Sequence, residues 1–335
     1  MCSCFLFGCG QNEAVSGGAP QTNLGSSTPP VAGPVAGPVA GPITGPVKGP
    51  ASDSPIKSDI DFSAIIWPKD MTINDQRALE LALNITGSFE GNESWINISN
   101  NSDKQGMSLG LLSQNFGSGT LQPLLVKMQE NYPSLMARIF SQAHLTSLYA
   151  MLADWKTQTP SIIPNSHARI SLLDMVPMAD PDATSVLWAA QNLYSGSAFI
   201  TQWKSEFQAM AALPQYINLQ FTDALSMHSA AKAYSVRTGI AELRAYLMMF
   251  DIVDQNGYIP DGDFADYATY LQVNPHASDT TKLAELVNLR IRHVNPVYAR
   301  DVKSRKMAIV NGQGLVHSAQ RNLETEFNFN RLETY

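Results

Sequence analysis

The sequence predicts an α+β fold that is mostly helical and carries one small antiparallel β-hairpin or sheet. After residue 120, apolar side chains recur at helical spacing through most of the chain. Residues 95–98 and 107–111 instead alternate between apolar and polar side chains, as half-buried strands do. One small sheet beside many helices is typical of the α+β class, in which the helices supply most of the core.

The helices are expected in the following order. Asn74 or Asp75 can cap a first helix, whose apolar stripe continues to Leu83 and whose helical pattern ends at Glu90. Proline residues then separate further helical segments, because proline cannot continue a helix. These segments are 121–130, 134–155, 183–193, 198–212, 215–236, 238–254, 280–293 and 296–309.

The chain divides into three parts by composition. Residues 10–62 are rich in Gly, Pro, Ser, Ala and Thr, and a four-residue repeat runs from Val31 to Pro50 as VAGP, ITGP and VKGP. Proline at every fourth position blocks helices and sheet ladders, so we interpret this part as an extended tether without a core. Residues 63–335 then form one domain, and residues 1–9 match a truncated lipoprotein signal.

All three cysteines lie in the first nine residues, at Cys2, Cys4 and Cys9. The 63–335 domain therefore holds no disulfide and no cysteine-based metal site. The sequence Leu-Phe-Gly-Cys that ends at Cys9 matches a bacterial lipobox, which would make Cys9 the lipidated residue of a secreted, periplasmic or outer-membrane lipoprotein. A lipobox needs a charged start and an apolar run before it. Either the true start therefore lies upstream of the first residue, or the match is chance.

Charge and composition argue against several classes of partner. The net charge of −7 disfavours nucleic acid and suits a cationic polymer such as a partly deacetylated amino-sugar glycan. The chain contains no apolar run of about 18 residues, so the sequence predicts no transmembrane helix. The histidines lack the paired spacings of zinc sites, and residues 254–259 lack the ligand spacing of a calcium loop. We therefore expect no metal or other cofactor, and a monomer.

Glu90 and Asp103 are the candidate catalytic pair. Glu90 follows a helical run, where the negative end of the helix dipole disfavours an anion, and Phe89 adds an apolar wall. Asp103 lies in a polar segment ahead of the second strand. Two carboxyl groups on different elements, one a neutral acid and the other an anionic base, are the minimal machinery for cleaving a glycosidic bond. The alternative for Glu90 is a surface glutamate in a loop. The alternative for Asp103 is an aspartate that only forms a turn.

Five segments of the chain carry a family resemblance. They are 88–90 (SFE), 103–112 (DKQGMSLGLL), 119–125 (GTLQPLL), 250–257 (FDIVDQNG) and 310–317 (VNGQGLVH). With these segments, roughly residues 70–330 resemble the chitosanase branch of the lysozyme-like glycoside hydrolases, namely glycoside hydrolase family 46 and its cell-wall-active bacterial relatives. Two departures stand out. Glu90 and Asp103 are closer in sequence than the family pair usually is, and Gln114 stands where relatives tend to carry an aromatic residue.

The resemblance implies a lysozyme-like fold whose small sheet flanks the active-site cleft, and it implies roles for individual residues. Glu90 would be the general acid and Asp103 the base, with Glu93 as the reserve candidate for the base. The side chains that would contact sugar hydroxyls or the attacking water are Ser108, Gln114, Asn115, Asp251, Gln255 and Asn256. The alternative for these side chains is ordinary sheet, turn or helix-cap polarity.

The implied activity is cleavage of β-1,4 bonds in an amino-sugar polymer by general acid/base catalysis. Peptidoglycan is the first choice of substrate, because residues 119–125 and 310–317 resemble the cell-wall-active relatives. An acidic cleft would favour deacetylated glycan, and chitosan is the alternative substrate. A hypothesis of another class is a non-catalytic wall-binding lipoprotein, which the short hairpin and Gln114 support.

Overall fold

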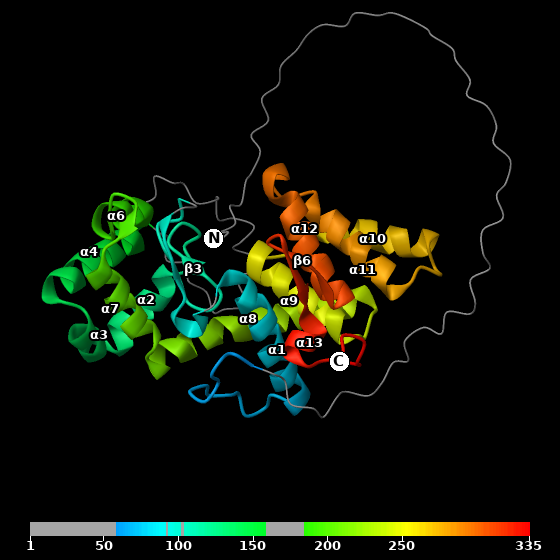
Figure 1. The fold of residues 1–335 in the computed structure, drawn as a ribbon, viewed down its shortest axis with the longest axis horizontal. Coiled ribbons are helices and arrows are strands. Elements are labelled where there is room, and N and C mark those ends of the chain that lie inside the picture. Colours follow the sequence, from blue (N-terminus) through cyan, green and yellow to red (C-terminus); the bar gives the residue numbers. More distant parts are fainter. Residues whose placement is uncertain (1–57, 92, 102–103, 159–183) are drawn as a thin grey trace, which may run out of the picture.

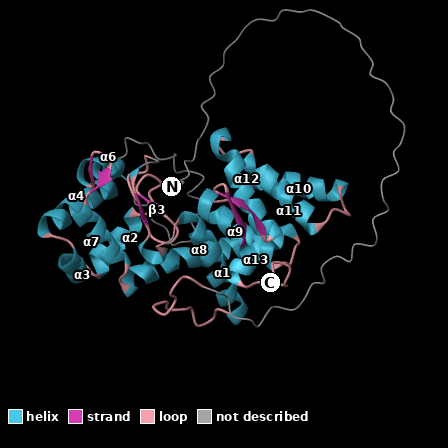
Figure 2. Cartoon of the chain, in the orientation of Figure 1, coloured by secondary structure: helices cyan, strands magenta, loops and turns pink. Residues whose placement is uncertain are grey.

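The computed structural model of the chain describes residues 58–91, 93–101, 104–158 and 184–335. Helices make up most of these residues, and the strands form small antiparallel sheets (Figure 2). The predicted α+β, mostly helical class is confirmed. The sequence predicts one small sheet, whereas the described residues form three: β1-β2-β3, β4-β5 and β6-β7. Cys9 and most of the predicted tether lie outside the described residues.

The elements follow one another in the order below, and Figure 1 labels the α-helices together with β3 and β6. Those of the first half are α1 (Ile73–Glu90), η1 (Ser94–Ile96), β1 (Ile98–Ser99), β2 (Ser108–Leu109), β3 (Gln114–Asn115), α2 (Gln122–Asn131), α3 (Pro133–Ile139) and α4 (Gln142–Gln158). Those of the second half are α6 (Thr184–Asn192), β4 (Tyr194–Ser195), β5 (Ala198–Phe199), α7 (Thr201–Ala211), α8 (Pro214–Thr238), α9 (Leu243–Asn256), α10 (Asp261–Val273), α11 (Asp279–Ile291), α12 (Pro296–Asn311), β6 (Gln313–Val316), β7 (Ala319–Asn322) and α13 (Leu323–Phe327).

Two clusters of buried apolar side chains form separate cores. The first core is built mainly by α2, α4 and α7, with Leu125, Leu148 and Phe207 among its members. The second core is built mainly by α1, α9, α11 and α12. Helix α8 lies between the two groups in Figure 1 and contributes to both, with Tyr216 in the first core and Phe221 in the second.

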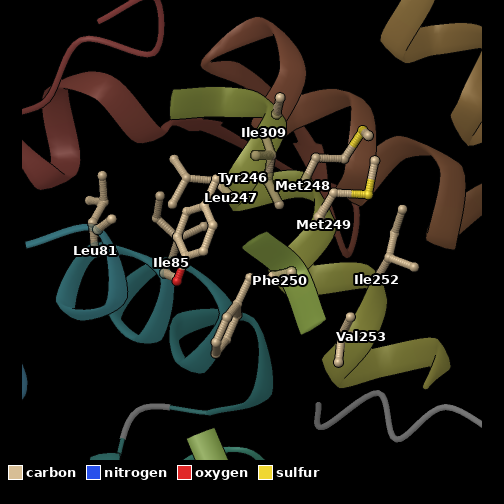
Figure 3. Packing of buried hydrophobic residues seen from close by; sticks show 14 of the residues in the cluster. Leu81, Ile85, Tyr246, Leu247, Met248, Met249, Phe250, Ile252, Val253 and Ile309 are labelled. Carbon is tan, nitrogen blue, oxygen red and sulfur yellow. The ribbon is translucent and has the colours of Figure 1, made fainter. Parts of the chain in front are cut away.

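Helix α9 is the centre of the second core. Almost every residue from Leu243 to Asn256 is buried, because α1, α8 and α12 all pack against this helix. Figure 3 shows Leu81 and Ile85 of α1 opposite Phe250 of α9. A helix that is enclosed on so many sides must find partners for any charge that it carries. The acidic residues of α9, together with their partners, therefore define the candidate site.

The cap of helix α1 lies two residues before Asn74, which is the earlier of the two predicted caps. The cap is Thr72, whose Oγ1 accepts a hydrogen bond from the Asp75 N–H at 3.1 Å, rather than Asn74 or Asp75. The Thr72 hydroxyl also donates to Asp75 Oδ2 at 2.9 Å, so Asp75 belongs to the first turn of the helix. The helix continues without interruption to Glu90, as its pattern predicts.

The folded part of the chain includes residues 58–62, which the sequence places in the tether. Ile60 and Phe62 pack against the second core. The Trp95 Nε1–H donates to the Asp61 carbonyl at 2.9 Å, and the Ser58 hydroxyl donates to Asn84 Oδ1 at 2.9 Å. Two apolar side chains so close to the first helix gain more from burial than from extension into solvent.

Several predicted helix boundaries are wrong. The segment 134–155 divides into α3 and α4, because Phe140 is extended. Residues 198–199 form β5 rather than the start of a helix, and neither α10 nor the β6–β7 hairpin was expected. Among the described residues, none of the helices combines the length and the apolar character needed to cross a bilayer.

Candidate functional site

Glu90 is the last residue of α1, and its carboxylate is held by Arg305 of α12. The Arg305 Nη1–H donates to Glu90 Oε1 at 2.5 Å. The guanidinium also lies 4.8 Å from the centre of the Phe89 ring, in a cation–π contact. The Glu90 side chain keeps 12 % of its surface exposed, whereas that of Arg305 has none. A fully buried guanidinium thus holds a carboxylate that is partly exposed to solvent.

Two further carboxyl groups surround the same guanidinium. Arg305 Nε and Nη2 donate to Asp251 Oδ1 at 2.8 and 2.6 Å. Arg305 Nη2 also lies 3.7 Å from Asp254 Oδ2, which is too long for a hydrogen bond but short enough for an ion pair. Three acidic side chains from two helices, α1 and α9, therefore meet at one arginine of α12.

Lys306 is the second cation of the group. Its Nζ donates to Asp251 Oδ2, to the Asp251 carbonyl at 3.0 Å and to Gln255 Oε1 at 2.6 Å. Burial lowers the pKa of Lys306 to about 8, although Asp251 opposes that change. We call Glu90, Asp251, Asp254, Arg305 and Lys306 the Arg305 cluster.

The pKa values of the two aspartates in the cluster are shifted in opposite directions. Burial alone would raise the pKa of Asp251, but the charges of Arg305 and Lys306 outweigh it and hold that pKa below its ordinary value. Burial raises the pKa of Asp254 well above its ordinary value, and the negative charge of Glu90 adds to the effect. Two carboxyl groups one helical turn apart thus have pKa values that are shifted in opposite directions.

Helical spacing explains why the cluster forms. Asp251, Asp254 and Gln255 are three and four residues apart, so they share one face of α9. That face packs against α12, which supplies Arg305 and Lys306. Charged side chains within a buried helix are tolerated only when they are paired, and here each helix provides the partners of the other.

The β6–β7 hairpin supports the end of α1. His317 Nε2 lies 3.1 Å from the Phe89 carbonyl, and His317 Nδ1 lies 3.1 Å from Asp301 Oδ2. Arg321 Nη2 donates to the Ser88 hydroxyl at 3.2 Å. The segments 88–90, 250–257 and 310–317, which carry part of the family resemblance, therefore converge on one region.

The described residues do not include a candidate base next to Glu90. Asp103 lies outside them. Glu93, the reserve candidate, is exposed and accepts a hydrogen bond from Gln208 Nε2 at 2.8 Å. Its partner belongs to α7 of the other group of helices, so Glu93 serves there as a surface contact.

The predicted polar residues of the small sheet are mostly buried. Ser108 in β2 and Gln114 in β3 have little exposed surface, and the side-chain amide of Gln114 has no hydrogen-bond partner among the described residues. The Asn115 Oδ1 accepts a hydrogen bond from the Ser118 N–H at 2.7 Å, which closes the turn before α2. Turn formation, the alternative given above for these residues, thus describes Asn115 directly.

The predicted contact of Asp251 with substrate is wrong, because Asp251 has no exposed surface. Gln255 and Asn256 are also buried, and Gln255 accepts a hydrogen bond from Lys306. The Asn256 carbonyl accepts a hydrogen bond from Arg290 Nη2 at 3.2 Å. These residues at the end of α9 stabilise neighbouring helices and do not line an open surface.

The residues missed from the sequence are Asp254, Arg305 and Lys306. One signal was present: Asp251 and Asp254 stand in a segment of α9 that is otherwise almost wholly apolar, and buried acids require buried bases. An adjacent Arg-Lys pair that leads into the apolar run Met-Ala-Ile-Val on α12 could have been matched to them. Pairing these bases with the acids of α9 requires knowing that α9 and α12 are in contact, which the sequence does not show.

Comparison with protein-family models, with curated proteins and with solved structures gives no match. The family resemblance therefore rests on the quoted segments alone. Among the described residues, no group of three or more His, Cys, Asp and Glu side chains is arranged to hold a metal ion.

Proposed function

We propose that the protein is a glycoside hydrolase that cleaves β-1,4 bonds in peptidoglycan, with Glu90 as the general acid. The observation that supports it is the position of Glu90 within the Arg305 cluster. Glu90 is the most exposed of the five side chains, at 12 %, and is the one through which the cluster can meet a substrate. The choice of peptidoglycan, with chitosan as the alternative, comes from the sequence resemblance.

In this mechanism the neutral Glu90 carboxyl gives its proton to the glycosidic oxygen. The bond between that oxygen and the anomeric carbon then breaks, and its electron pair stays with the oxygen. A water molecule adds to the anomeric carbon and loses its proton to a second carboxylate, for which Asp103 is the first candidate and Glu93 the second. Arg305 fixes the direction of the Glu90 side chain, which is what a proton transfer over a short distance requires.

A preference for deacetylated glycan is expected to be modest. Asp251, which the sequence places in the cleft, is neutralised by Arg305 and Lys306 and has no exposed surface. Glu90 is paired with Arg305 and must be neutral to act as the acid, so any attraction for a glucosamine ammonium is expected mainly from the candidate base. Such an attraction between exposed charges weakens as salt is added.

A non-catalytic wall-binding protein remains a second candidate. The observation that favours it is the ion pair between Glu90 and a fully buried arginine, because a charge network of this kind also serves to fix how helices pack. In that case Glu90 joins α1 to α12 and has no chemical role.

Glu90→Gln separates the two candidates. The substitution removes the proton donor and changes little volume, so we expect hydrolysis to fall by about 10²- to 10⁴-fold while the chain stays folded by circular dichroism. The measurement is release of reducing ends from intact sacculi, from deacetylated sacculi and from chitosan. Glu93→Gln is the matched control and should keep most of the activity if Asp103 is the base.

Three outcomes would change these assignments. Hydrolysis by Glu90→Gln within about threefold of wild type would remove Glu90 as the acid. Binding of sacculi by wild type without release of reducing ends would favour the wall-binding protein. A loss of hydrolysis in Glu93→Gln as well would move the base from Asp103 to Glu93.

A further inference from the structure

A pocket of about 450 Å³ lies between the first turn of α1 and the end of α8. Its volume falls within the range of roughly 300–1,000 Å³ that is typical of ligand sites. Helix α1 rises by about 1.5 Å per residue, so the pocket is roughly 25 Å from Glu90 at the other end of this helix. The side chains of its wall that matter here are Thr72, Asn74, Asp75, Lys232, Ser235 and Val236.

The Ser235 hydroxyl is a buried polar group of this wall without a partner. Ser235 is 7 % exposed, and its hydroxyl makes no hydrogen bond to another described residue. Two earlier serines of the same helix differ, because the hydroxyls of Ser226 and Ser229 donate to the carbonyls four residues before them, at 3.4 and 3.0 Å. A buried hydroxyl without a partner is costly. Ser235 therefore indicates that its partner is a molecule within the pocket.

The two charged side chains of the wall are paired with each other. Lys232 Nζ donates to Asp75 Oδ1 at 2.6 Å. The Tyr335 and Thr72 hydroxyls also donate to Asp75, each at 2.9 Å, so both of its carboxylate oxygens have donors. An ammonium has three N–H groups, and Lys232 uses one of them on a described residue. The exposed Asn74 amide makes no hydrogen bond to a described residue. The pocket thus offers mainly hydrogen-bond donors, and its lysine is already neutralised.

Apolar side chains lie beside these donors. Val236 and Ile240 line the pocket, and Ile73 lies between two residues of its wall. Ile73 is 82 % exposed and Val236 is 81 % exposed, which makes them the most exposed large apolar side chains among the described residues. Single exposed apolar residues are common, but two of them at the edge of one pocket favour a ligand with an apolar face.

We propose that this pocket binds an N-acetylated sugar unit and is a second glycan site, separate from Glu90. A neutral sugar has hydroxyls that accept hydrogen bonds from lysine, amide and hydroxyl groups, and the C–H face of its ring can pack on apolar side chains. The acetamido carbonyl only accepts hydrogen bonds, which suits a wall rich in donors, and its methyl group suits Val236. A small anion fits less well, because Lys232 is paired with Asp75 and is the only cation among the described residues that line the pocket.

The test is a titration with the disaccharide of β-1,4-linked N-acetylglucosamine, followed by NMR of isotope-labelled isoleucine and valine methyl groups. The parent protein is Glu90→Gln, so that hydrolysis does not consume the disaccharide. The signals of Val236 and Ile240 should shift and saturate. The corresponding disaccharide of glucose, which lacks the acetamido group, should bind about three- to tenfold more weakly. Inorganic phosphate should not compete with either sugar.

Ser235→Ala tests the hydroxyl directly. The substitution breaks no hydrogen bond between side chains of described residues, so stability should not change while binding weakens about three- to tenfold. Ser229→Ala is the matched control on the same helix, because its hydroxyl already donates to the Leu225 carbonyl and does not line the pocket. This variant should bind as the parent does.

Val236→Ala tests the apolar edge of the pocket, with the signal of Ile240 as the reporter. The substitution removes apolar surface that the sugar would cover, so binding should weaken. Val273→Ala is the matched control, because Val273 at the end of α10 is also highly exposed but lies away from the pocket. The control should leave the titration unchanged.

Several outcomes would overturn the proposal. They are the absence of shifts at Val236 and Ile240 at millimolar disaccharide, equal binding by Ser235→Ala and Ser229→Ala, and shifts caused by phosphate at lower concentrations than by the disaccharide, which would make the pocket an anion site. Saturable shifts at the pocket in a protein whose wild type hydrolyses no glycan would support the second site and count against the proposed function. The two proposals can therefore fail independently.

Discussion

The two ends of helix α1 treat a carboxylate in opposite ways. Asp75 in the first turn accepts hydrogen bonds from Lys232 Nζ at 2.6 Å, from the Tyr335 hydroxyl at 2.9 Å and from the Thr72 hydroxyl at 2.9 Å. Glu90 at the last position shares Arg305 with two other acids. One end offers several donors to one acid, and the other offers one arginine to three acids.

The difference follows from helix electrostatics and indicates which end can do chemistry. The beginning of a helix favours an anion and the end disfavours it. Burial alone would raise the pKa of Asp75, but the hydrogen bonds from Lys232, Thr72 and Tyr335 outweigh it and lower that pKa. At the other end, burial raises the pKa of Asp254, and the negative charge of Glu90 adds to the effect. A carboxylate with several hydrogen-bond donors stabilises the fold, whereas a buried carboxyl group crowded by other acids is protonated more easily.

The largest expected effect comes from removing the shared cation. Arg305→Met leaves three acids with one lysine in a buried site, and we expect a loss of about 3–5 kcal/mol in the free energy of unfolding. Urea unfolding followed by circular dichroism measures it. The control is Lys156→Met, which breaks an exposed pair with Glu130 and should cost about 0–1 kcal/mol. Equal losses in the two variants would mean that the Arg305 cluster contributes no more than a surface pair.

Asp75→Asn should cost less, about 1–3 kcal/mol at pH 7, because hydrogen bonds to an ionised group are lost. The sign of its pH dependence differs from that of Asp254. The pKa of Asp75 is lower in the folded state, so its stabilisation is present above the unfolded value near 3.8 and disappears as the pH falls through the folded value. The free energy of unfolding of wild type and variant, measured from pH 2 to 7, should converge in acid. A constant difference would contradict the assignment.

The smallest effects separate the supports of the two helix ends. Thr72→Ala removes the cap, and His317→Ala removes the contact with the Phe89 carbonyl, each at a cost of about 1 kcal/mol. Only the second should lower hydrolysis of sacculi, because only the second displaces the end of α1 that carries Glu90. Equal changes of hydrolysis in both variants would show that α1 responds as one rigid body and that its two ends are not distinct.

Local sequence patterns predicted much of the helical framework. The segments 121–130, 215–236, 280–293 and 296–309 lie close to α2, α8, α11 and α12, because their apolar spacing and flanking prolines are local signals. The β6–β7 hairpin was missed because its strands are largely polar. Its turn is made by His317 and Ser318, both with positive φ, where glycine or asparagine would have signalled a turn.

The candidate site was predicted only in part. Glu90 could be selected because it follows a helical run, which is a local feature. Its partner Arg305 lies 215 residues later, and no local pattern relates the two. The polar character of residues 251–256 was noticed, but whether a polar side chain faces solvent or another helix depends on packing. Asp251 was therefore placed in a cleft when it belongs to the interior.

The order of charges along the chain also bears on how the molecule folds. Helices α1 and α9 bring three acids together, while both bases arrive on α12, about fifty residues after α9 acquires its own acids. Pairing of α1 with α9 alone gathers like charges in an apolar setting and is unfavourable. Docking of α12 brings in Arg305 and Lys306, whose positive charges make the electrostatic interaction favourable. We therefore expect the three helices that carry these charges, α1, α9 and α12, to gain and lose their structure together.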